Sequence, residues 1–128
     1  MAKYTEESLV PATKEYVVLK KKASRLQTAI TDPKLFSIDL LSENLISEST
    51  YQRVNAPVTT LDAQGYELIN SLLKAVVIDP GNFHKLLEVL ENHPPLLTAV
   101  AKEMKDYVHV YGALFALKYH LKALPTSY

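Results

Sequence analysis

Apolar residues recur at helical spacing along most of this chain, most clearly over residues 60–90. This stretch predicts two helices separated by Asp79-Pro80-Gly81-Asn82, with Asp79 placed to cap the second helix and Pro80 at its first position. The predicted core face of the first helix comprises Leu61, Leu68, Ile69, Leu72, Leu73 and Val76. The second helix places Phe83, Leu86, Leu87 and Leu90 on one stripe. Two apolar helices joined by so short a turn must pack together, and they need further helices to cover them.

The same signals predict further helices at about residues 13–31, 33–43 and 47–54, and from residue 94 onward. Thr13 and Ser47 are placed as helix caps, Asp32-Pro33 starts the helix between them, and Thr59-x-x-Asp62 has the spacing of a capping box that opens the long helix. The core-facing residues predicted in these helices are Leu19, Ala23, Leu26, Ile30, Leu35, Phe36, Leu40, Leu41, Leu97, Val100, Met104 and Tyr107.

These elements predict an all-α fold, a six-helix antiparallel bundle over residues 13–106. Residues 1–12 have no clear period and are expected to form an N-terminal arm. Residues 107–128 form an apolar C-terminal extension, which can add an extra helix. A tail this apolar is expected to fold back on the bundle, to meet another copy, or to contact a membrane or a partner.

Composition narrows the function classes. The chain has no cysteine, which excludes disulfides and cysteine–zinc sites and favours a reducing compartment. Its formal net charge is zero, so no general attraction to nucleic acid or anionic membranes is expected. No apolar run approaches the ~20 residues that a membrane-spanning helix needs, and the N-terminus lacks the pattern of a signal peptide.

Charge is unevenly distributed along this neutral chain. Residues 1–31 carry six Lys or Arg and three Asp or Glu, a net charge of +3, whereas residues 32–67 carry two basic and six acidic side chains, a net charge of −4. Two segments of opposite sign favour head-to-tail contact between copies. Ordinary solvated helix surfaces are the competing interpretation.

Catalytic motifs do not appear in the sequence. It contains no Gly-rich phosphate loop, and its four histidines are never spaced i, i+4 as a helix-borne metal site requires. Asp39 and Glu43 lie four residues apart, a spacing more typical of a solvated helix face than of an acid–base pair. The run Lys20-Lys21-Lys22 lacks interleaved aromatic residues and is a weak nucleic-acid signal. The chain is therefore expected to be non-enzymatic and to bind no cofactor, metal or nucleic acid.

The order of elements resembles the caspase recruitment domain (CARD) of the death-fold superfamily, a six-helix Greek-key bundle. The likeness covers roughly residues 14–106. It is carried by the apolar, cap and acidic pattern of residues 43–51, which read ENLISESTY, and by residues 80–87, which read PGNFHKLL. The sister death domains and death-effector domains share this helical plan.

The resemblance implies a cytoplasmic signalling adaptor that makes homotypic CARD–CARD contacts, with itself or with another CARD protein. Such contacts build homo-oligomers or helical filaments in apoptosis and innate immunity. In this family a basic face commonly meets an acidic face. The matching basic positions are Lys21, Lys22, Arg25 and Lys74, and the matching acidic positions are Asp39, Glu43 and Glu48. The alternative is a helical module that binds a membrane or a partner peptide through residues 107–128.

Overall fold

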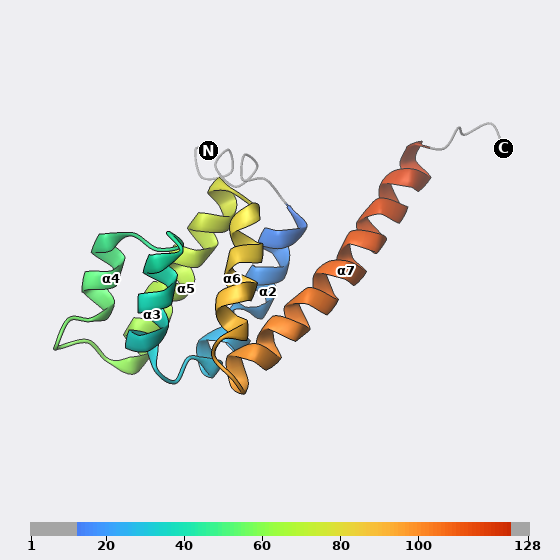
Figure 1. Cartoon of the computed structure of the whole chain (residues 1–128). Helices are drawn as coiled ribbons and strands as arrows, with labels where there is room; N and C mark the ends of the chain where they lie inside the picture. The colour runs from blue at the N-terminus through green and yellow to red at the C-terminus, as the bar shows by residue number, and fades with distance from the viewer. Residues whose placement is uncertain (1–12, 124–128) are drawn as a thin grey trace.

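The computed structural model describes the backbone of residues 13–123 and the side chains of residues 13–113 (Figure 1). This part of the chain is an all-helical bundle without strands. Its helices are α2 (Lys14–Ala29), α3 (Pro33–Ser42), α4 (Glu48–Val54), α5 (Leu61–Ile78), α6 (Gly81–Glu91) and α7 (Leu96–Ala123). The expected N-terminal arm, residues 1–12, lies outside the described residues.

Side-chain caps fix where most of these helices begin. The predicted caps Thr13, Asp32 and Ser47 are confirmed, since each accepts a hydrogen bond from the backbone N–H three residues later. The capping box predicted at Thr59 is wrong by one residue, because the Thr60 hydroxyl accepts from the Ala63 N–H at 3.1 Å. Each cap satisfies a backbone donor that the first helical turn leaves without a partner.

The turn before α6 uses the two residues that the sequence singled out. The Asp79 carboxylate accepts a hydrogen bond from the Gly81 N–H at 2.9 Å, and Pro80 already has a helical backbone with φ −57° and ψ −23°. The Asn82 side chain donates to the Ala75 carbonyl at 2.9 Å and ties the turn back to α5. This tight connection returns α6 along the bundle next to α5 (Figure 1).

The core is continuous and draws on all six described helices. Its largest fully buried side chains are Phe36, Phe83, Leu19, Leu26, Leu40, Leu68, Leu72, Leu86, Leu90, Met104, Val18 and Val54. Two predicted core residues are wrong: Leu35 is 52% exposed and Leu61 is 54% exposed. Leu35 precedes the buried Phe36 on α3 but lies on the exposed face of that helix. Leu61 is the first residue of α5, and its side chain is left largely uncovered there.

Helix α7 closes the core and then continues beyond it. Val100, Ala101 and Met104 are buried, and Tyr107 and Val108 are half-buried against α2 and α6. The helix runs without a break to Ala123, so the first part of the predicted extension prolongs the last bundle helix and is not a separate element. Figure 1 shows its C-terminal half leaving the bundle at an angle.

The end of α3 depends on one residue with a left-handed backbone, Asn44 at φ 59°. The Leu45 N–H donates to the Leu40 carbonyl at 2.9 Å and the Asn44 N–H donates to the Leu41 carbonyl at 3.0 Å. These two bonds form a Schellman motif, in which the left-handed residue favours Gly or Asn. Leu45 is thereby turned into the core, where it is 2% exposed.

We expect Asn44→Val to lower the free energy of unfolding by about 1–2 kcal/mol, since a β-branched residue is strained in the left-handed region. Asn44→Gly should match or slightly exceed the wild type. Asn92→Val is the matched control, because Asn92 is also exposed at a helix end but has a φ of −88°. Urea unfolding measures all three, and an equal loss at Asn44 and Asn92 would contradict this account.

Candidate interaction surfaces

The predicted basic residues of α2 lie along its border with α7. We call Lys21, Lys22 and Arg25 the α2 basic patch. Arg25 donates a hydrogen bond to Glu103 of α7 at 3.1 Å, and the Lys22 ammonium lies 3.5 Å from the same carboxylate. The Lys22 side chain is 26% exposed and that of Arg25 is 43% exposed. Lys22 is therefore partly covered, because Glu103 and Tyr107 of α7 lie next to it.

Tyr107 of α7 completes this border. The ammonium groups of Lys21 and Lys22 lie 5.3 Å and 5.6 Å from the centre of its ring, within the range of cation–π attraction. The hydrogen bond and charge interaction with Tyr107 raise the pKa of Lys21 above its usual value. The hydrogen bond from Arg25, followed by the charges of Arg25 and Lys22, holds the pKa of Glu103 below its usual value. The Glu103 carboxylate is therefore ionised at neutral pH and already occupies part of the patch.

Acidic residues of α3 and α6 face one another on another side of the bundle. Asp39, Glu43 and Glu88, which we call the α3 acidic patch, line a shallow hollow of about 150 Å³. The His93 Nε2 atom lies 2.6 Å from an Asp39 oxygen, and the His93 ring packs edge-on against Phe36 at 5.4 Å. Asp39 nevertheless remains 47% exposed. Glu43 is exposed and pairs with no cation among the described side chains.

The structure leaves two of the predicted site residues apart from these patches. Glu48 is exposed in the first turn of α4 and does not line the acidic hollow. Lys74 is exposed on α5, in a polar groove of about 550 Å³ between α4 and α5. The same groove holds the ion pair of Arg53 and Glu67, whose atoms lie 2.6 Å apart. Lys74 therefore does not join the α2 basic patch.

Sequence reasoning missed the partners of these charged residues. Glu103 lies 78 positions from Arg25, and His93 lies 54 positions from Asp39. No local spacing rule connects residues this far apart, since their contact depends on how α7 and the α6–α7 connection pack. The sequence predicts Tyr107 as a core-facing residue, but its ring also contacts the two lysines.

The described residues offer no candidate metal site and no buried polar side-chain atom that lacks a hydrogen-bond partner. Within residues 13–113, no group of three or more His, Asp or Glu side chains could hold a metal ion. In that same part of the chain, every buried side-chain nitrogen or oxygen has a hydrogen-bond partner. None of the helices, as far as their residues are described, is long and apolar enough to cross a membrane. The charged groups instead lie on open surface.

No protein family, curated protein or solved structure matches this chain. A functional proposal therefore depends on the two charged patches and on the resemblance noted in the sequence.

We expect Glu103→Gln to lower the free energy of unfolding by less than about 1 kcal/mol at neutral pH, as is usual for exposed ion pairs. A carboxyl group whose pKa is lowered by folding stabilises the fold above its unfolded-state pKa, and this contribution is lost as the pH falls through its folded-state pKa. The difference between wild type and Glu103→Gln should therefore be constant near neutral pH and begin to shrink as the pH approaches about 4.3, the ordinary Glu value. It should vanish only at lower pH, below the folded-state pKa of Glu103.

Denaturant unfolding at a series of pH values measures this difference. Glu43→Gln is the control, because Glu43 lies in none of the ion pairs of the described side chains. A difference that persists unchanged in strong acid would show that the Glu103 carboxylate is not responsible.

Proposed function

We propose that this chain is a non-enzymatic, CARD-type interaction module whose copies associate when the α3 acidic patch of one docks on the α2 basic patch of the next. The observation that carries the proposal is the presence of two exposed patches of opposite charge on different helices of one small, neutral bundle. Complementary charge sets the register in which two copies bind and speeds their encounter.

The two patches cannot neutralise each other within one copy. Helix α2 packs against α5, α6 and α7, whereas α3 packs against α4, α5 and α6. The basic patch lies on the border of α2 with α7, and Figure 1 places α3 and α4 on the side of the bundle away from α7. A contact between unlike patches is heterologous, so each added copy leaves one patch of each kind free, and the assembly can continue to grow.

Both patches keep groups that a second copy can reach. Arg25 and Asp39 are each nearly half exposed despite their intramolecular partners, and Lys21 and Glu43 are exposed. Docking would exchange the Glu103 carboxylate for a carboxylate of α3 at the same cations. The partner is therefore a second copy or another CARD-type protein with an acidic patch, in a cytoplasmic signalling assembly of the apoptotic or innate-immune type that the resemblance implies.

Reversing charge on either patch tests the pairing. We expect Arg25→Glu and Glu43→Lys each to weaken self-association about tenfold, because each puts like charges in contact. The two variants mixed together should associate more tightly than either alone, since the two reversed charges attract each other across the contact between unlike copies. Sedimentation velocity across a concentration series measures the effect.

Lys74→Glu is the matched control for Arg25→Glu, because it makes the same change in charge on an exposed residue outside the patch. It should associate like the wild type. Circular dichroism should show all the variants folded. Equal association of wild type, Arg25→Glu and Glu43→Lys would contradict the proposed pairing.

The Glu103 ion pairs should restrain association, because they occupy the cations that a partner needs. Glu103→Gln is expected to raise the association constant about threefold, which corresponds to the ~0.6 kcal/mol of an exposed ion pair. Glu67→Gln is the matched control, since it removes an equal charge from an ion pair with Arg53 that involves neither α2 nor α7. The same sedimentation measurement applies, and an equal rise in both variants would reject competition at the patch.

A further inference from the structure

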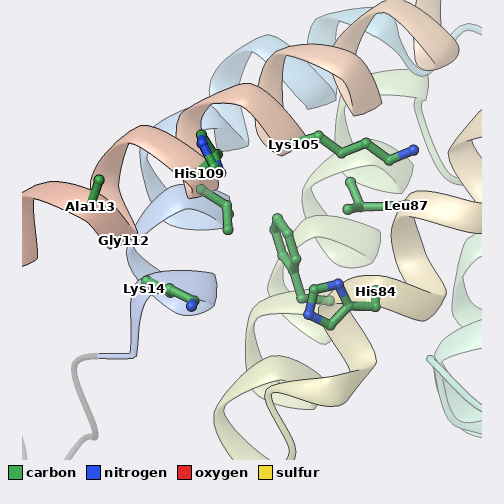
Figure 2. A pocket seen from close by; sticks show the side chains of 9 residues that line it. Lys14, His84, Leu87, Lys105, His109, Gly112 and Ala113 are labelled. Atoms are coloured by element: carbon green, nitrogen blue, oxygen red, sulfur yellow. The ribbon is translucent and has the colours of Figure 1, made fainter. Parts of the chain in front are cut away.

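A groove lies where α7 leaves the bundle, and none of its lining residues belongs to the two charged patches. It has a volume of about 520 Å³ and lies between the first turn of α2, the first half of α6 and the middle of α7. Figure 2 shows the side chains of Lys14, His84, Lys105 and His109 around it. Its lining residues are Lys14, Phe83, His84, Leu87, Lys105, Val108, His109, Gly112 and Ala113.

The groove combines an apolar floor with a rim that carries no acid. Phe83 and Leu87 are almost fully buried beneath it, and the half-buried Val108 adds to the floor. Every titratable side chain in the lining is a lysine or a histidine. Two carboxylates pair with residues of the rim, Glu91 with Lys105 and Glu15 with His84 at 3.9 Å. Lys14 forms no ion pair among the described side chains and faces the groove. The chemistry fits an apolar group that carries a carboxylate.

The same chain offers such a group at the start of α5. Eight large hydrophobic residues are exposed on the described surface, and three of them fall within residues 58–66. Val58 is 93% exposed, Leu61 is 54% exposed and Tyr66 is 61% exposed. Asp62 lies among them, and its carboxylate forms no ion pair with a described residue. We call Val58, Leu61, Asp62 and Tyr66 the α5 knob.

We propose that the groove beside α7 is the docking site for the α5 knob of a second copy of this chain. Apolar side chains of the knob would cover Val108 and Ala113, which keep exposed surface in the groove, and the Asp62 carboxylate would meet Lys14. Among the other exposed apolar residues, Leu35 and Ile38 lie on α3, the helix whose Asp39 the proposed function already uses.

The positions of knob and groove decide the kind of assembly. Figure 1 shows that α5 begins at the end of the bundle opposite to the ends where α2 and α6 begin. One copy therefore cannot fill its own groove with its own knob. Contact between the two is head-to-tail, and every added copy presents a fresh groove or knob. The inference rests on the proposed homotypic assembly but assigns it a second, largely apolar interface.

Engineered cysteines test the contact directly, because the chain has none of its own. We expect the double variant Val58→Cys/Ala113→Cys to give a ladder of disulfide-linked trimers, tetramers and longer species on mild oxidation. The two single variants mixed together should give mainly the dimer that joins one to the other. In the control, Gln52→Cys replaces Val58→Cys, since Gln52 is exposed on α4 outside the knob, and no ladder should form.

A second variant tests the groove without a crosslink. A Cβ atom added at Gly112 would lie 3.5 Å from the Lys14 Cδ atom, an ordinary contact, so the first atom of a substituted side chain fits beside Lys14. Gly112→Leu should fill the groove and weaken self-association about tenfold. Gly112→Ala, which also improves helix propensity, should have little effect.

The outcomes separate this inference from the proposed function. Absence of the ladder in a chain that assembles, or an equal ladder from the Gln52 control, overturns the knob-and-groove contact and leaves the charged patches standing. If the ladder forms and Arg25→Glu does not change assembly, the knob-and-groove contact is supported and the pairing of the charged patches is rejected. A wild-type chain that stays monomeric at every concentration rejects both.

Discussion

Packing of α7 against α2 and α6 is the contact on which the rest of this structure depends. Val100, Ala101 and Met104 close the core from one side, and none of them is more than marginally exposed. The same helix carries Glu103 and Tyr107 to the cations of α2, and Val108 and Gly112 to the edge of the groove. A single helix thus completes the fold and shapes two of the surfaces through which copies of the chain are proposed to meet.

In the proposed assembly, the fold and the docking partner compete for the same positive charges on α2. Lys22 and Arg25 stabilise the bundle through Glu103, and a docking partner would have to replace that carboxylate. Exposed ion pairs contribute little to stability, so the exchange costs the fold little. At the acidic patch, His93 holds Asp39 in a similar way, while Glu43 and Glu88 stay available. Such a surface favours reversible, concentration-dependent contacts over permanent ones.

Much of the fold could be predicted from the sequence because its helices are bounded by local signals. Thr13, Asp32 and Ser47 each cap a helix by accepting a hydrogen bond from the backbone N–H three residues later. The apolar stripes indicate which side of a helix is buried. The errors at Leu35 and Leu61 have a different origin. An apolar residue can be buried, but whether a neighbouring helix covers it depends on the angles at which the helices pack. Those angles cannot be read from the sequence of one helix.

The candidate surfaces were predictable only in part for the same reason. The residues Lys21, Lys22, Arg25, Asp39 and Glu43 were singled out through the resemblance to the CARD family. Their partners were not, because Glu103 and His93 reach them through tertiary packing. Lys74, predicted to share the basic face, belongs to a separate groove on α5. The groove beside α7 could not be foreseen, since it depends on how α7 passes Lys14 and α6 in the folded chain.

Association through surfaces of opposite charge is the central claim, and the mass of the wild-type chain in solution tests it most directly. Sedimentation velocity across a concentration series, at about 50 mM and about 500 mM salt, gives that mass. We expect the weight-average mass to rise with concentration at low salt and to rise less at high salt, because salt screens the contact between the patches. A mass of 14.3 kDa at every concentration and both salt levels would contradict it.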